Sequence, residues 1–594
     1  MAFRFAPLSN SSSKRTYTIE DASAGLGATG LDNQDRVIIA LDFGTTYSGV
    51  AYCFCNPSSK PDPLSILTYC VGLEGRTQPK VPTAILYDPH DSTKFKWGGQ
   101  LTWRDDHVQG VKLLLDLKQT RPSYLPSSSA KREIRRLPKD VVDVVADFMK
   151  AMYSYALEKI GSKVPQNYLD LCEKSFVLSV PAVWSDKAKE RTIQAAKKAG
   201  VYPVTLVKEP EAAALYTFMT QERALSPGDC FVVCDAGGGT VDLISYEVVS
   251  TEPTLDLAEL VPGKGNMSGS LGLNKRFAEA VRDLIGDEEW FRLKKLDAWA
   301  LAERQFDQEI KTSFTGDLDD DLIVNFPGAR LEDNVDEGLE RDSWFMSGET
   351  VHEIFEPLIA DIVRLVNEQL HSIKNEKPDN PIKGIFLVGG FGSSQYLKSR
   401  IEEAKPDIQV IQPDDAWAAI VKGAALSRLS YTNVISTKAT RHYGVSSWSI
   451  YEPAVDKDRP TSISLVTGRL RAERMTWYII MGETLRRDRN ERYPFHRYIP
   501  KSYSENDLRF RDELWMSETQ VQPQHPTKDV KLNCILKSDL TTVDRSRFKE
   551  VVGIDGREWL KVQYDLVIST REAAMKFWLE FDGKEAGSIL ATYT

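Results

Sequence analysis

The sequence has no long hydrophobic run and no excess of positive charge. No apolar stretch approaches the ~20 residues that a membrane-spanning helix needs. The net charge of −10 excludes a general electrostatic affinity for nucleic acids. We therefore expect neither a membrane nor a nucleic acid among the partners of this protein.

Cysteine is scarce and is not spaced for metal binding. The seven cysteines are an odd number and show no zinc-type pairing. Cys53 and Cys55, like Cys230 and Cys234, lie in or beside expected strands, where burial as small apolar residues explains them. This usage favours a reducing, intracellular compartment. We expect a cytoplasmic protein, with the nucleus as the alternative.

The chain is too long for one hydrophobic core, and its sequence pattern changes twice. Residues 1–35 are rich in Ser, Thr, Gly and Asn and predict a disordered tail. Residues 36–430 mix strand and helix patterns, which is typical of an α/β domain. Residues 431–594 alternate apolar and polar positions, as in 560–568, and predict a β-rich C-terminal domain that could hold a peptide.

Two distant segments share one pattern: an apolar strand, an aspartate, a glycine turn with hydroxyl residues, and a second strand. The first covers residues 37–51 and turns after Asp42, and the second covers 230–246 and turns after Asp235. Bare glycines let backbone N–H groups approach a phosphate, and a carboxylate at a strand end suits Mg²⁺. The pair suggests two lobes that face one nucleotide. The alternative is two ordinary hairpins with glycine turns.

Other segments add candidates to these two turns. Glu209 precedes Pro210 at an expected helix start beside a strand end, where open α/β sheets place ligands. Residues 384–392 predict a buried strand that enters a third glycine turn. Lys112 and Lys118 lie in an expected short amphipathic helix, and the ordinary interpretation of both is a solvated charge.

The order of these segments resembles the nucleotide-binding domain of the heat shock protein 70 (DnaK-type) chaperone family, within the actin, hexokinase and chaperone ATPase superfamily. The matching stretches are LDFGTTYS (41–48), SVPAVWSD (179–186), EPEAAA (209–214), DAGGGTVD (235–242) and LVGG (387–390), with GAA (423–425) as a weaker sixth. The match is looser than matches within the main chaperone line, which indicates a divergent branch with an atypical C-terminal half.

The resemblance implies an actin-like (ribonuclease H-like) fold with ATP or ADP and Mg²⁺ in a cleft between two lobes. Lobe I would cover about 36–227 and 409–430, and lobe II about 228–408. Asp42 and Asp235 would orient the water shell of the metal. Lys118, Glu209, Thr240 and Asp242 would be catalytic. The nucleotide would be bound by Gly44, Thr45, Thr46, Tyr47, Gly237, Gly238, Gly239, Thr240, Lys311, Gly389, Gly390 and Asp414.

The sequence also departs from the family pattern. Around residues 307–313 only Lys311 survives from the adenine-binding helix, and Ser393 stands where the family has an arginine. The linker that couples nucleotide state to the substrate domain is not visible between residues 428 and 442, and a helical lid is missing.

These features favour an ATP-dependent chaperone with weak ATPase activity, whose β-rich domain holds extended peptide clients and which works with co-chaperones. A nucleotide-sensing scaffold that binds ATP with little hydrolysis is the alternative. A small-molecule kinase of the same superfamily is a third hypothesis, which the β-rich domain does not support.

Overall fold

The computed structural model describes residues 35–55, 63–65, 78–102, 104–105, 107–108, 110–116, 127–220, 225–413, 415–429 and 432–593. Except for Asp35, the expected N-terminal tail lies outside these residues, and so do Lys118 and Asp414. The described chain forms two compact units, and the boundary between them falls between Asn433 and Val434.

The first unit contains two mixed sheets. The N-terminal sheet has the strand order β3-β2-β1-β7-β8, with β4 (Val81–Pro82) on β2. Its other strands are β1 (Arg36–Asp42), β2 (Tyr47–Cys55), β3 (Leu64–Ser65), β7 (Glu173–Val180) and β8 (Val204–Lys208). β1 pairs antiparallel with β2 and parallel with β7, and β7 pairs parallel with β8.

The second sheet repeats this plan later in the chain. The order β11-β10-β9-β16-β17 again places a central strand between an antiparallel hairpin partner and a parallel neighbour. The strands are β9 (Cys230–Ala236), β10 (Val241–Ser250), β11 (Leu255–Glu259), β16 (Ile382–Val388) and β17 (Val410–Ile411), with β12 (Lys264–Asn266) on β10. The two copies are the sheets of the two lobes.

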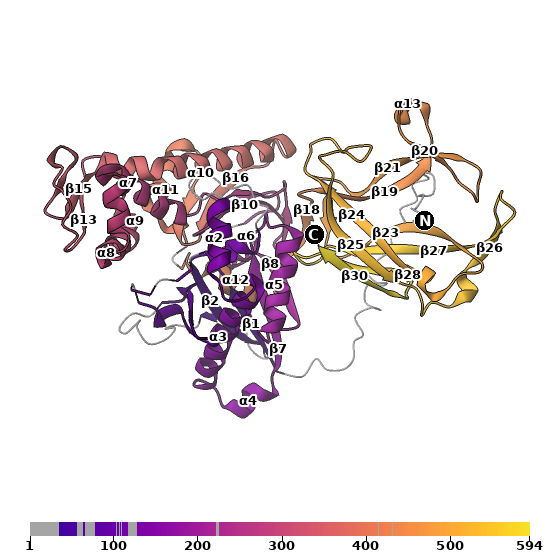
Figure 1. Ribbon diagram of the computed structural model, residues 1–594, viewed down its shortest axis with the longest axis horizontal. Helices are drawn as coiled ribbons and strands as arrows, with labels where there is room; N and C mark the ends of the chain where they lie inside the picture. The colour runs from indigo at the N-terminus through magenta and orange to yellow at the C-terminus, as the bar shows by residue number, and fades with distance from the viewer. Residues whose placement is uncertain are drawn as a thin grey trace. The chain divides into compact units, whose positions relative to one another are not determined.

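Helices cover both sheets. The main helices of the N-terminal lobe are α3 (Val141–Gly161), α5 (Asp186–Lys198), α6 (Glu209–Thr220) and α12 (Ala419–Leu426), and those of the second lobe are α7 (Leu271–Leu293), α10 (Gly348–Glu376) and α11 (Gln395–Ala404). Figure 1 shows α3 and α5 beside β1 and β7, and α7, α10 and α11 in the second lobe. None of the described helices combines the length and apolar character that crossing a bilayer requires.

Local sequence explains where these helices begin. Asp140 caps α3 by accepting a hydrogen bond from the backbone N–H of Val142, and Ser185 caps α5 through that of Ala188. Gly200 follows α5 with φ of +83°, a conformation that favours glycine. The helices α3 and α5 therefore start and stop close to where the sequence predicts.

A smaller substructure extends the second lobe. It contains α8 (Asp297–Gln305), a π-helical turn (Phe306–Ile310) and the sheet β13-β15-β14, formed by Asp321–Asn325, Ser343–Ser347 and Leu339–Glu340. Phe277 of α7 stacks on Phe306 with a ring-centroid distance of 4.2 Å. Val324, Trp344 and Met346 are buried in the same core, so this substructure has a buried apolar face.

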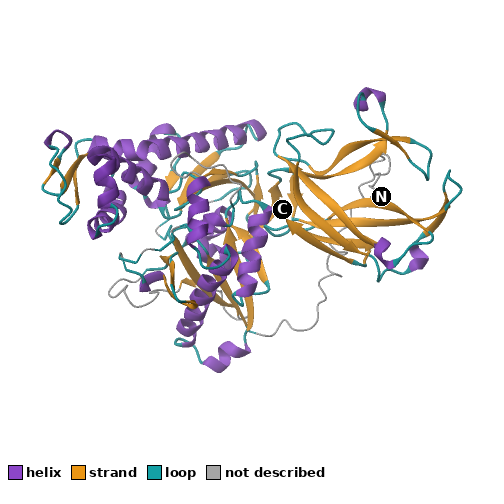
Figure 2. Cartoon of the chain, in the orientation of Figure 1, coloured by secondary structure: helices purple, strands orange, loops and turns teal. Residues whose placement is uncertain are grey.

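The second unit is a β-sandwich (Figure 2). One sheet has the order β20-β21-β19-β24-β25-β30, and the other has β23-β27-β28-β29 with β26 on β27. The strands are β19 (His442–Ile450), β20 (Thr461–Ile463), β21 (Leu470–Ile479), β23 (Glu491–Pro500), β24 (Arg509–Ser517), β25 (Lys531–Asp539), β26 (Lys549–Val552), β27 (Glu558–Ser569), β28 (Lys576–Phe581), β29 (Lys584–Glu585) and β30 (Ser588–Tyr593). Both sheets contribute side chains to one apolar core.

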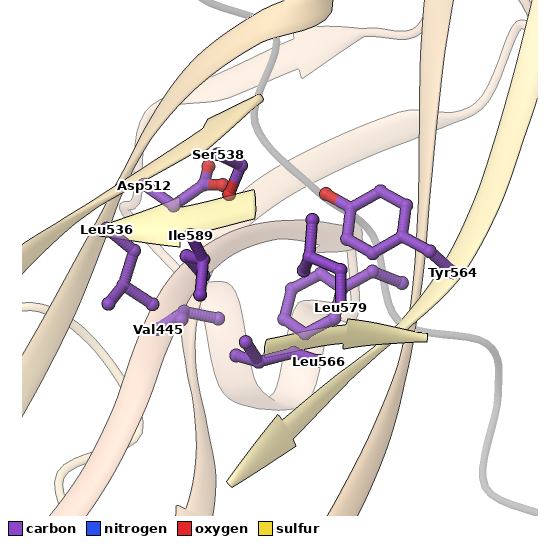
Figure 3. A pocket seen from close by; sticks show the side chains of 9 residues that line it. Val445, Asp512, Leu536, Ser538, Tyr564, Leu566, Leu579 and Ile589 are labelled. Carbon is purple, nitrogen blue, oxygen red and sulfur yellow. The ribbon is translucent and has the colours of Figure 1, made fainter. Parts of the chain in front are cut away.

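Packing inside this sandwich is close. Leu560, Val562, Tyr564, Leu566 and Ile568 of β27 are all buried, as the alternation in the sequence predicts. Figure 3 shows a small pocket among Leu536, Leu566 and Leu579, with the Asp512 carboxylate on one side. Its free space of about 10 Å³ suits one water molecule, so this pocket is too small for a peptide.

Candidate functional site

The two aspartate–glycine turns lie against each other. A Cβ atom added to Gly238 would lie 2.1 Å from Thr46 Oγ1, and one added to Gly239 would lie 2.4 Å from Thr45 Oγ1. The absence of side chains at these glycines is what allows the hydroxyl residues of the first turn to approach the second. The structure thus brings together two segments that are nearly two hundred residues apart.

The backbone of the second turn is held at both ends. The N–H of Gly237 donates to the carbonyl of Thr240 at 2.9 Å and closes the turn. The N–H of Leu271, the first residue of α7, donates to the carbonyl of Gly238 at 2.7 Å. These bonds fix the loop between β9 and β10 and attach it to the start of α7.

Four buried carboxylates converge beside these turns. Asp42 ends β1, Asp235 is the second-last residue of β9, Asp242 is the second residue of β10, and Glu209 begins α6 directly after β8. All four are at most 6 % exposed. Burial, together with the charges of Glu209, Asp242 and Asp42, raises the pKa of Asp235 well above its usual range. Such mutual repulsion favours a cation at this position.

Two buried lysines oppose these carboxylates. Lys112 Nζ lies 2.5 Å from Glu209 Oε1, and Lys80 Nζ lies 2.6 Å from Asp42 Oδ2. Burial raises the pKa of Glu209 to about 7, against the opposing attraction of Lys112. Burial alone would lower the pKa of Lys112, but Glu209 and Asp42 outweigh it and raise that pKa. Lys112 therefore stays protonated in the site.

The end of β7 and the residues that follow it supply hydrogen bonds to two of these carboxylates, Asp42 and Asp242. Ser179 Oγ donates to Asp42 Oδ1 at 2.7 Å, and the N–H of Val183 donates to Asp242 Oδ1 at 3.2 Å. Trp184 places its ring 5.5 Å from Lys112 Nζ. The stretch 179–186 thus orients two carboxylates and one lysine, although it contributes no acid or base to the cluster.

The other predicted residues occupy the surroundings of this cluster. Gly389 has φ of +87°, and a Cβ atom there would lie 2.5 Å from Asp235 Oδ1. A Cβ atom added to Gly390 would meet no atom of the described residues within 4 Å. Tyr47 packs edge-on against Trp417, and burial followed by the charge of Asp307 raises its pKa to about 12. The third glycine turn and Tyr47 thus border the site from opposite lobes.

Lys311 is engaged in a small polar cluster of the second lobe. Its Nζ donates to Asn274 Oδ1 at 3.1 Å and forms an ion pair with Asp307. Asn274 Nδ2 also donates to Asp307 at 3.0 Å. Because Asp307 also acts on Tyr47, this cluster faces the first hairpin.

The expectation that Lys112 is a solvated charge is wrong. Lys112 is 3 % exposed in a short 3₁₀ turn (Val111–Leu114), which replaces the expected amphipathic helix. Lys118 lies outside the described residues, so its assignment stays a prediction. One feature of the sequence could have indicated burial of Lys112, namely its position among four apolar residues. All four of these residues are buried. The sequence held no comparable signal for Lys80.

Comparison with known proteins gives two family matches. The family described as "Hsp70 protein" matches residues 139–250, from just before α3 through β10. A second family, described as "Domain of unknown function (DUF8340)", matches residues 226–413. The Hsp70 match therefore contains Glu209, Asp235 and Asp242 of the carboxylate cluster.

Relatives that match about two thirds of the chain agree with the first match. Human "Heat shock 70 kDa protein 12A" is 24% identical over 498 residues, covering 69% of this chain and 72% of the relative. Human "Heat shock 70 kDa protein 12B" is 24% identical over 509 residues, 70% of this chain and 72% of the relative. A "Chaperone protein HscA homolog" of Acinetobacter baumannii is 22% identical over 416 residues, 66% of this chain and 58% of the relative. The chain is Hsp70-like.

These similarities confirm the resemblance to a divergent Hsp70 branch. They also confirm the fold class, an actin-like two-lobed domain followed by a β-rich domain, which the repeated sheets and the sandwich display. They support an Hsp70-like ATP-binding protein.

Proposed function

We propose that this Hsp70-like protein binds ATP or ADP with Mg²⁺ between its two lobes and hydrolyses ATP slowly. The observation that carries the proposal is the Lys112–Glu209 ion pair beside Asp42, Asp235 and Asp242, where the two glycine turns meet. Phosphoryl transfer needs positioning and charge neutralisation more than covalent chemistry, and this cluster supplies both.

The residues present fit a magnesium nucleotide. Among the described residues, Asp235 Oδ1 and Asp242 Oδ2 are buried oxygens without a hydrogen-bond partner, which leaves acceptors for the hydration water of a cation. Within the described ranges, no three acidic, His or Cys side chains stand close enough to ligate a metal directly, so water would mediate the contact. Mg²⁺ bound with the nucleotide would neutralise charge on the phosphates.

The chain's own groups have distinct tasks in this proposal. Thr45, Thr46 and the backbone of the second turn bind the phosphates. Lys112 holds a positive charge next to the transferred group, because its ammonium is kept protonated by Glu209 and Asp42. Glu209 and Asp242 orient the attacking water, since carboxylate oxygens accept its protons in hydrogen bonds.

We further propose that the β-sandwich holds extended apolar segments of protein clients, that co-chaperones assist it, and that the protein works in the cytoplasm or nucleus. The relatives' names, "Heat shock" and "Chaperone protein", support a chaperone role. The edge strand β20 also carries exposed apolar side chains: Ile463 is 59% exposed, and Leu465 just after it is 43% exposed. An exposed apolar strand edge suits pairing with an extended peptide.

A second candidate is a nucleotide-sensing scaffold with little turnover. It is favoured by the Lys311–Asp307–Asn274 cluster, which engages the lysine retained from the family's adenine-binding helix. An internally bonded lysine has less capacity to bind the nucleotide.

The test is nucleotide binding by calorimetry together with phosphate release by the purified full chain. ATP binding with measurable turnover that Asp235→Ala abolishes supports the chaperone ATPase. Tight binding without phosphate release selects the scaffold, and no uptake of either nucleotide contradicts both.

A further inference from the structure

Lys80 lies beside Asp42 in the site, where the pairing of β4 with β2 holds it. Ser48 of β2 lies opposite Val81 of β4, so the residue before β4 is held next to the first glycine turn. A Cβ atom on Gly49 would lie 3.1 Å from Lys80 Cγ and 2.8 Å from the Pro79 carbonyl. Gly49 thus leaves the space in which the stem of this lysine packs.

The ammonium of Lys80 forms a buried ion pair with Asp42 of the carboxylate cluster. Its Nζ lies 2.6 Å from Asp42 Oδ2, with side-chain exposures of 6% for Lys80 and 3% for Asp42. Ser179 Oγ holds the other oxygen of Asp42 at 2.7 Å. Both oxygens of this carboxylate therefore have a protein donor, one of which carries a full positive charge.

Lys80 also acts on Asp235. Among the charges around Asp235, those of Glu209, Asp242 and Asp42 raise its pKa and that of Lys80 lowers it. Lys80 thus pairs directly with Asp42, and its charge also favours the ionised form of Asp235. A buried ammonium at this position would attract the negative phosphate oxygens, as a divalent cation does.

We propose that Lys80 is a built-in cation at the metal side of the nucleotide site, and that it makes nucleotide binding only weakly dependent on Mg²⁺. This inference rests on the proposed nucleotide-binding function. Lys80 is a positioning residue: it neutralises Asp42 and leaves Lys112 as the lysine on the side of the attacking water.

The test measures the affinity of the full chain for ADP and ATP by calorimetry, once with Mg²⁺ and once with EDTA. In the wild-type protein we expect EDTA to weaken binding by about tenfold or less, because the protein ammonium remains in the site. Lys80→Met keeps the apolar stem and removes the charge, so EDTA should then weaken binding by at least about tenfold more than in wild type.

Two further variants separate charge from packing. Lys80→Arg restores the charge and should return the small metal dependence of the wild type. Lys139→Met removes a different ion pair of the same unit, with Asp147 at 2.7 Å, and should leave the metal dependence unchanged.

The outcomes distinguish this inference from the proposed function. Wild-type binding that EDTA abolishes, or an equal metal dependence in wild type and Lys80→Met, overturns the role of Lys80 while nucleotide binding stands. If Lys80→Met does not fold, the wild-type comparison still decides. No nucleotide uptake with or without Mg²⁺ overturns the proposed function itself.

Discussion

Lys112 Nζ and Glu209 Oε1 lie 2.5 Å apart, although 97 residues separate the two in sequence. The side chains are 4% and 7% exposed, so the pair is shielded from solvent. A buried ion pair contributes little net stability, because desolvation offsets the attraction. Its position beside three further carboxylates instead suits chemistry on a phosphate.

Lys112→Met should lower ATP turnover by about 10²–10³-fold, because a preorganised charge near developing negative charge is lost. Phosphate release under single-turnover conditions measures this loss. Removing Lys112 also leaves Glu209 buried without its partner, so thermal unfolding should be recorded for the same variant.

The matched comparison is Lys118→Met. If Lys112 is the lysine that faces the phosphates, Lys118→Met keeps turnover within about twofold of wild type. The reverse pattern, with turnover lost only in Lys118→Met, would show that the sequence-based assignment of Lys118 is right.

Asp235→Asn should stabilise the nucleotide-free protein and weaken nucleotide binding in Mg²⁺. The pKa of Asp235 is raised by burial and by neighbouring carboxylates, so its ionised form opposes folding at neutral pH. We expect Tm to rise by a few °C, measured by calorimetry without nucleotide.

Asp229→Asn is the control for this variant. Asp229 is also buried near the start of β9, but it accepts a hydrogen bond from the N–H of Ser226 at 2.9 Å and lies 3.7 Å from Lys383. Its substitution should lower Tm and leave nucleotide affinity unchanged. A lower Tm in Asp235→Asn would contradict the proposed repulsion.

Gly238→Ala should disrupt the contact between the two turns, since its new Cβ atom would lie 2.1 Å from Thr46 Oγ1. Both Tm and nucleotide affinity are expected to fall. The new Cβ atom of Gly390→Ala would meet no atom of the described residues within 4 Å, so this variant should keep the wild-type Tm. If the third glycine turn borders the nucleotide, Gly390→Ala nevertheless weakens binding, and unchanged affinity would exclude that position.

The stability of the β-sandwich should fall as the pH drops below neutrality because of His496. Burial, with the charge of Lys561, lowers its pKa from 6.5 to about 4, and its Nδ1 has no hydrogen-bond partner in the described part of the chain. Between these values the unfolded chain binds more protons than the folded one. His496 therefore costs no stability above pH 6.5 and an increasing amount as pH falls toward 4.

Thermal unfolding at about pH 7.5 and about pH 5 tests this expectation. The decrease in Tm should be smaller by a few °C in His496→Gln than in wild type. His371→Gln changes an exposed histidine of α10 and serves as the control. Equal decreases in wild type and His496→Gln would show that another group causes the pH dependence.

Features encoded locally were predictable from the sequence. The Asp582-Gly583 turn adopts φ of +50° and +75° between β28 and β29, as its residue types require. The helix caps at Asp140 and Ser185 follow from short side chains that accept backbone N–H groups. The repeated aspartate–glycine turns predicted the two lobes because strand, turn and strand are contiguous in sequence.

The charge balance of the site was not predictable in the same way. Whether Lys112 is solvated or buried depends on Glu209, which no local pattern connects to it. Lys80 meets Asp42 only because β4 pairs with β2, and β4 is two residues long. The carboxylates could be predicted because they lie at strand ends or at a helix start, which the sequence pattern reveals. The lysines that oppose them lie in or beside short segments, which have no such pattern.

The most direct test of the central claim is calorimetric titration of the full chain with ADP and Mg²⁺, repeated with Asp235→Ala. The account predicts one binding site per chain in the wild-type protein and a clear loss of affinity in the variant. Absence of ADP uptake by wild type, or equal affinity in both proteins, would contradict it.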